Sequence, residues 1–199
     1  MSRLALPFAT GRKALIAYVT VGYPSLEATL KAVPLLASWG CDAVELGIPF
    51  SDPMADGPTI QRASHHSLLQ GTTPELCLEV AARLRKKVDI PLLFMTYYNL
   101  LLAHGLDAFS SRCAQAGVDG LIIPDLPPEE GTELQGYAQR HGVDLVYLLA
   151  PTSTAARIEL VARKSQGFIY LVSVTGITGA RDRLPVELED FVARVRKVA

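Results

Sequence analysis

Short apolar runs alternate with amphipathic segments along the whole chain. The runs are nearly continuous in apolar residues, which predicts strands buried on both faces of a parallel sheet. We expect these strands at residues 14–22, 42–47, 90–97, 118–125, 144–150 and 167–174. A segment with helical periodicity follows each of them, as in a sheet covered by helices. The pattern therefore predicts an α/β protein with six successive βα units.

The helical segments carry recognisable start and stop residues. Ser25 is placed to cap the first helix, which we expect to stop at Gly40, and Thr73 followed by Pro74 begins a later one. Further helices are predicted at residues 59–70, 106–117, 127–142, 153–165 and 185–199. No linker or low-complexity tract interrupts the series, so we expect a single domain over residues 1–199.

Two architectures fit alternating strands and helices, the doubly wound open sheet and the (β/α)₈ barrel. No GxGxxG motif follows the first predicted strand, which disfavours a dinucleotide-binding sheet. A closed barrel requires eight βα units and about 250 residues, whereas six units are found in these 199 residues. Spacing alone therefore leaves both architectures open.

Composition narrows the class of protein. The chain is 49% hydrophobic and 20% charged with a formal net charge of −1, which is ordinary for a soluble globular protein and argues against nucleic acid as the main partner. No stretch reaches the roughly 18 apolar residues of a membrane span, and the N-terminal apolar run is too short for a signal peptide. Cys41, Cys77 and Cys113 lie far apart without a CxxC motif, which indicates a reduced, cytoplasmic protein.

Candidate chemistry gathers where the predicted strands end, because ligands of α/β folds bind at the carboxyl ends of the strands. Glu45 interrupts an apolar strand, and an unpaired buried carboxylate is costly. Glu45 is therefore either an acid with a raised pKa in a pocket or half of an internal ion pair. Asp52 and Asp56 follow in a loop with three prolines. Turn chemistry explains Asp52 better, whereas for Asp56 a turn and a functional role are equally open.

Other polar residues at the same strand ends are less specific. Tyr97 and Asn99 follow the third strand and are compatible with packing or with substrate contact, and Asp125 ends the fourth. The TGITGAR loop at residues 175–181 is compatible with a flexible crossover, a lid, or backbone N–H groups that approach an anion. The pair His65–His66 lacks a partner four residues away, so we interpret it as structural or exposed.

The segment VELGIPFSDPMADGPTIQ at residues 44–61 resembles the signature of the tryptophan synthase alpha subunit. ALIAYVTVGYP, MTYYNL, DGLIIPDLP and YLVSVTGITGAR support the resemblance in the expected order, and it covers essentially the whole chain. It implies a TIM (β/α)₈ barrel, of which this chain carries about six units. It also implies a carbon–carbon lyase of tryptophan biosynthesis that cleaves indole-3-glycerol phosphate to indole and glyceraldehyde 3-phosphate.

The resemblance assigns roles to individual residues. Glu45 matches the acid/base that protonates indole C3, and Asp56 matches the carboxylate that stabilises positive charge on the indole ring. The residues implied to bind substrate are Tyr18, Tyr97, Ile122, Tyr170, Thr178 and Gly179; of these, Tyr170 orients Glu45 and Gly179 helps to hold phosphate. The alpha subunit needs no cofactor. Its partner is the beta subunit, which uses pyridoxal phosphate, in an α₂β₂ heterotetramer.

Two departures from the family pattern lead to expectations. The segment before residue 11 is shorter than expected, so we expect a trimmed version of the helix that plugs the barrel floor. The chain ends where strands seven and eight of the barrel should follow, so we expect an incomplete domain that is poorly stable and nearly inactive alone. The alternatives are a catalytically impaired barrel fragment that acts only by binding another chain, and another phosphate-handling barrel enzyme such as an isomerase.

Overall fold

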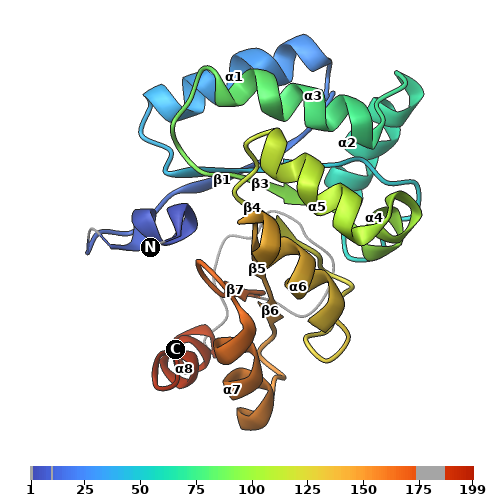
Figure 1. The fold of residues 1–199 in the computed structure, drawn as a ribbon. Helices are drawn as coiled ribbons and strands as arrows, with labels where there is room; N and C mark the ends of the chain where they lie inside the picture. The colour runs from blue at the N-terminus through green and yellow to red at the C-terminus, as the bar shows by residue number, and fades with distance from the viewer. Residues whose placement is uncertain (1, 10, 174–186) are drawn as a thin grey trace.

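Parallel strands in chain order form the centre of the molecule (Figure 1). The computed structural model describes residues 2–9, 11–173 and 187–199. Its larger sheet contains β1 (Ile16–Thr20), β2 (Ala43–Gly47), β3 (Leu92–Met95), β4 (Gly120–Ile122) and β5 (Asp144–Val146). A second parallel pair consists of β6 (Leu148–Leu149) and β7 (Tyr170–Leu171).

The strand order separates the two architectures. A doubly wound sheet reverses its strand order at a switch point, whereas neighbouring strands of a (β/α)₈ barrel follow the order of the chain. Here β1 to β5 pair in sequence order, and β6, which follows β5 after one residue, pairs with the next strand, β7. Six predicted strand segments therefore lie side by side as in a barrel. Among the described residues, β1 pairs only with β2 and β7 only with β6.

Helices follow the strands at nearly the predicted places. Their bounds are η1 (Arg3–Phe8, a 3₁₀ helix), α1 (Leu26–Ser38), α2 (Pro58–Leu69), α3 (Pro74–Arg85), α4 (Tyr98–His104), α5 (Leu106–Gln115), α6 (Thr132–His141), α7 (Ala155–Lys164) and α8 (Leu188–Arg196). Ser25 and Thr73 are the caps of α1 and α3, because their side chains accept hydrogen bonds from the backbone three residues on. Helices α1 and α3 pack against each other on the outer side of the sheet (Figure 1).

Most strands are shorter than predicted, and three further features differ from the prediction. The fifth strand is interrupted at Tyr147, whose carbonyl accepts a hydrogen bond from Tyr170 N–H, so the run divides between β5 and β6. Helix α6 begins at Thr132 instead of residue 127, because Glu130 and Gly131 form turns onto the Pro127 carbonyl. Helix α4 was not predicted at all, since it has only seven residues and no side-chain cap of its own.

Two hydrophobic clusters cover the two faces of the sheet. The larger one lies between strands and helices and includes Leu46, Phe94 and Leu121 from the strands. The smaller one contains Leu4, Ala43, Leu93, Ile122 and Val146, with Met95, Leu148 and Tyr170 packed against it. Because side chains alternate along a strand, the second set faces the opposite way from the first. This smaller cluster is the interior of the barrel.

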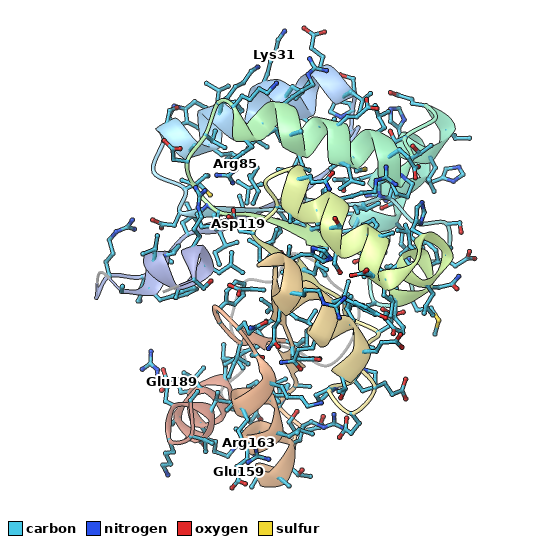
Figure 2. All side chains as sticks on the ribbon, viewed as in Figure 1. Lys31, Arg85, Asp119, Glu159, Arg163 and Glu189 are labelled. Carbon is cyan, nitrogen blue, oxygen red and sulfur yellow. The ribbon has the colours of Figure 1, made fainter. Side chains whose placement is uncertain are left out.

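A short N-terminal plug is present where we expected a trimmed helix. Leu4 of η1 lies in the interior cluster and is 1% exposed. A Cβ added at Gly120 would lie 2.5 Å from Leu4 Cδ1, so the bare backbone of β4 admits this side chain. Arg85 of α3 holds Asp119 at 3.0 Å close by, beside the amino end of β4 (Figure 2). The segment η1 therefore closes the end of the barrel opposite to the carboxyl ends of the strands.

Leu4→Ala should lower the free energy of unfolding by about 2–5 kcal/mol, because it removes a fully buried side chain and leaves a cavity. Leu6→Ala is the matched control, since Leu6 lies on the same 3₁₀ helix and is 51% exposed. Urea denaturation of both variants measures the difference. Equal stabilities of the two variants would show that η1 does not close the barrel.

Candidate active site

Glu45 lies in the middle of β2, whose five residues are all buried. It is 6% exposed and stands in register between Tyr18 of β1 and Leu93 of β3. Leu93 belongs to the interior cluster, so the Glu45 side chain faces the barrel interior. The pairing therefore fixes the position of the carboxyl group inside the barrel.

Burial raises the pKa of Glu45 from 4.5 to about 7, because a carboxylate loses hydration in this position. Loss of hydration is the whole cause, and no cation among the described residues offsets it. Of the two interpretations from the sequence, the structure therefore favours the acid with a raised pKa over the internal ion pair. Near neutral pH this carboxyl group can both hold and release a proton.

Asp56 lies on the loop between β2 and α2 and is half-buried. Burial raises the pKa of its carboxyl group, and a hydrogen bond from the Tyr97 hydroxyl opposes that rise. Its backbone is held as well, since Gln61 Nε2 donates to the Asp56 carbonyl at 2.8 Å. Asp52 on the same loop is exposed, in agreement with a turn residue.

Tyr97 joins the end of β3 to the loop that carries Asp56. Its hydroxyl donates to Asp56 Oδ2 at 3.2 Å and accepts from Ala55 N–H at 2.9 Å. The ring stacks on Phe50, with centroids 5.1 Å apart. One side chain thus fixes the backbone, a ring and the carboxylate of this loop.

Tyr18 and Tyr170 are close to both carboxyl groups. The pKa of Tyr18 is raised to about 12, mainly by burial and to a smaller extent by the charges of Asp56 and Glu45, whereas a hydrogen bond with Thr20 lowers it. The pKa of Tyr170 is raised by burial and by the same two carboxylates. The structure therefore brings Tyr18, Tyr97 and Tyr170 together around the predicted pair.

Ile122 lies beside this group, fully buried in the interior cluster that Tyr170 also contacts. Thr178 and Gly179, the remaining predicted residues, lie outside the described residues. His66 Nε2 lies 3.2 Å from the Pro24 carbonyl oxygen, which can only accept a hydrogen bond, and His66 also contacts Gln70, in agreement with a structural role.

Two residues that shape the site, Gly47 and Phe50, were not identified from the sequence. Gly47 leaves room for the Tyr18 hydroxyl, because a Cβ at this position would overlap it. Phe50 provides the surface on which Tyr97 stacks. The glycine directly after the Glu45–Leu46 pair was a signal for close approach, whereas no local pattern relates Phe50 to Tyr97.

A metal centre and a membrane span have no support in the parts of the chain described. No group of three or more His, Cys, Asp or Glu side chains there could hold a metal ion. Within the same ranges, none of the helices has the length and apolar character needed to cross a membrane.

The raised pKa of Glu45 predicts a pH-dependent effect on stability. Between pH 4.5 and about 7 the folded chain holds a proton that the unfolded chain has released. The stability that Glu45 contributes in its protonated form is therefore fully present below pH 4.5 and is lost as pH rises through about 7. Glu45→Gln should therefore raise the free energy of unfolding at pH 8 by on the order of 3 kcal/mol, and change it little at pH 4. Glu79→Gln on exposed α3 surface should give no such pH dependence. Urea denaturation at both pH values tests this; equal effects at pH 4 and pH 8 would contradict a buried titrating carboxyl group.

The comparison with known proteins places this geometry in a family. The family model for "Tryptophan synthase alpha chain" matches residues 4–199. The chain belongs to the tryptophan synthase alpha chain family. The tryptophan synthase alpha chain of Dehalococcoides mccartyi is 58% identical over 199 residues, which are 100% of this chain and 78% of that one. The tryptophan synthase alpha chain of Geobacter sulfurreducens is 49% identical over 201 residues, covering 99% of this chain and 76% of its own length.

Solved structures agree with this family and with its barrel fold. A Mycobacterium tuberculosis tryptophan synthase superposes with a TM-score of 0.90 at 37% identity, covering 99% of this chain and 75% of that one. A structure from Aquifex aeolicus superposes with a TM-score of 0.92 at 41% identity, covering 100% and 78%. The prediction of a TIM barrel with six βα units in this chain is confirmed. The chain spans about three quarters of the length of these relatives.

Proposed function

We propose that Glu45 and Asp56 are the two catalytic groups with which this tryptophan synthase alpha chain acts. The reaction of the family is cleavage of indole-3-glycerol phosphate to indole and glyceraldehyde 3-phosphate, a carbon–carbon lyase step of tryptophan biosynthesis. One observation carries the assignment: the carboxyl groups of Glu45 and Asp56 both lie near Tyr18 and Tyr170. Glu45 is on a buried strand, whereas Asp56 is on a polar loop.

The reaction requires a proton at indole C3 before the carbon–carbon bond can break. Protonation makes the ring an electron-accepting indolenine cation, and the pair from the breaking bond then restores the aromatic ring. Glu45 supplies this proton, which its pKa of about 7 permits near neutral pH. As the bond breaks, the adjacent hydroxyl becomes the aldehyde and its proton passes to a carboxylate.

Asp56 carries out the opposite task. Its carboxylate accepts a hydrogen bond from the indole N–H and offsets the positive charge that develops on the ring. The Tyr97 hydrogen bond favours the ionised form of Asp56, whereas Glu45 receives no such bond from the residues that the structure describes. Different surroundings thus separate a proton-bearing group from an ionised one.

The remaining binding roles complete the proposal. Tyr18, Tyr97 and Ile122 line the indole pocket, and Tyr170 orients Glu45; their placement beside the two carboxyl groups supports these roles. Thr178 joins the pocket and Gly179 contacts phosphate. The reaction needs protons and charge stabilisation alone, so we propose no cofactor for this chain.

The partner is a tryptophan synthase beta subunit, since the solved neighbours are tryptophan synthases. We propose an α₂β₂ assembly in which pyridoxal phosphate belongs to the beta chain, and a cytoplasmic location. The mass of the purified complex in solution tests the stoichiometry; a 1:1 complex that does not dimerise would exclude it.

Indole release from indole-3-glycerol phosphate by the purified chain, with and without a beta subunit, tests the function. Release should decline as pH rises through about 7, because Glu45 then loses the proton it must deliver. A chain that binds the beta subunit but releases no indole in either condition would instead be a binding partner only.

A further inference from the structure

Helix α4 receives its N-terminal cap from another part of the chain. Its N-cap residue is Tyr97, which forms no side-chain cap hydrogen bond. The first helical N–H, that of Tyr98, instead donates to both carboxylate oxygens of Asp125, at 2.9 and 3.2 Å. Asp125 lies just beyond β4, on the connection to α6. The loop after one strand therefore fixes the start of the helix that follows its neighbour.

A tyrosine at an N-cap is unusual, because Ser, Thr, Asp and Asn are the residues whose side chains reach back to the helix. Here the tyrosine reaches away from the helix, to Ala55 N–H and the Asp56 carboxylate. The two tasks are therefore divided: Tyr97 holds the loop, and Asp125 caps the helix in its place. A carboxylate also suits the positive end of the helix dipole.

We propose that Asp125 is a positioning residue for the reaction: by capping α4 from the adjacent strand end, it fixes the backbone of Tyr97 and so the hydroxyl that holds Asp56. This inference rests on the proposed role of Asp56. Two hydrogen bonds of ordinary length join Asp125 to the site. Asp125 accepts one from the Tyr98 N–H, in the peptide unit next to Tyr97, and the Tyr97 hydroxyl donates the other to Asp56.

The charge of Asp125 supports the same arrangement. Burial is the main reason why the pKa of Tyr97 is raised, and the nearby charges of Asp56 and Asp125 raise it further. A tyrosine hydroxyl is protonated at neutral pH even in water, and these effects act in the same direction, so its donor stays available to Asp56. The main contribution of Asp125 is therefore to the place of this hydroxyl.

The Ala55 amide is a direct probe of this link, because its N–H bonds to the Tyr97 hydroxyl. Asp125→Ala should accelerate hydrogen exchange of that amide about fivefold, the factor for loss of one ordinary hydrogen bond. Amide exchange by NMR measures it in the full chain, and the Leu93 amide of the central strand β3 monitors global stability. Exchange at Leu93 should stay unchanged.

Three further variants separate positioning from general loosening. Asp125→Asn keeps an oxygen that can accept from Tyr98 N–H, so exchange at Ala55 should rise less than with Ala. Glu129→Ala removes a carboxylate of the same connection that pairs with Arg157 instead of α4, and should leave Ala55 unchanged. In a Tyr97→Phe background, Asp125→Ala should add nothing, because the hydroxyl that it positions is absent.

Indole release provides the second readout. Asp125→Ala should lower kcat severalfold with little change in KM, and more than Glu129→Ala does. Unchanged Ala55 exchange in Asp125→Ala, or equal acceleration in the Tyr97→Phe background, would overturn the proposal whatever the activity. Accelerated exchange with unchanged kcat would show that Asp125 holds the loop but that Asp56 lacks the proposed catalytic role.

Discussion

Glu45→Gln should lower indole release by about 10²–10⁴-fold, the range over which positioned acids and bases contribute to catalysis. The amide keeps the shape and polarity of the side chain, but its N–H groups are too weakly acidic to protonate indole C3. Because β2 holds this position in register between β1 and β3, the fold should be unaffected. Steady-state kinetics of indole formation, with KM determined alongside kcat, measure the effect.

The loss should fall on kcat, since substrate binding does not require the proton. Glu79→Gln, an exposed change on α3, is the matched control and should retain wild-type kinetics. A Glu45→Gln variant that kept more than a few per cent of activity would remove Glu45 from the central role. The same variant should be the more stable protein at pH 8, so a loss of activity cannot be attributed to unfolding.

The order of the elements was predictable because the chain repeats one unit. Each buried parallel strand leaves a continuous apolar run, and each helix leaves a period of about 3.6 residues, so the strands and most helices were predicted from local pattern. Ser25 and Thr73 marked helix starts because an N-cap is a local interaction. Glu45 stood out for a similarly local reason, as a charge inside an apolar strand.

The choice of barrel over open sheet was not predictable from spacing, since strand order is a long-range property. The same holds for α4, which has seven residues and takes its cap from Asp125, 27 residues away. The break at Tyr147 likewise depends on pairing with Tyr170, on another strand. Such long-range partners leave no pattern in the local sequence. The contact of Tyr97 with the Asp56 loop and the capping of α4 by Asp125 were therefore not predicted.

The different roles proposed for Glu45 and Asp56 follow from the backbone elements that carry them. Glu45 lies in a strand with an apolar residue on each side in the chain, and no cation in the described part of the chain compensates for its burial. Asp56 lies on a loop where a tyrosine hydroxyl can reach it. One backbone passes from strand to loop within eleven residues and so provides two different environments a short distance apart.

Asp56→Asn should lower kcat for indole release by about 10²-fold or more, as removal of a single charge-stabilising group does in other enzymes. The amide can still contact the indole N–H, but it carries no charge to offset the positive ring that forms after protonation. KM should change less than kcat, because the indole ring is neutral in the bound substrate and gains little from the charge before it is protonated.

Asp52→Asn is the matched control for this prediction, because Asp52 is an exposed aspartate of the same loop and should tolerate the change. Tyr97→Phe should produce a smaller loss than Asp56→Asn, since the carboxylate remains while one of its hydrogen bonds is removed. If Asp56→Asn raised KM and left kcat intact, the residue would bind substrate without stabilising the transition state.

The pKa of Asp56, which burial raises, predicts how activity depends on pH. Activity should decline at acidic pH, where this carboxylate takes up a proton. Together with the loss above pH 7 from Glu45, this predicts a bell-shaped profile whose acidic limb is absent in Asp56→Asn.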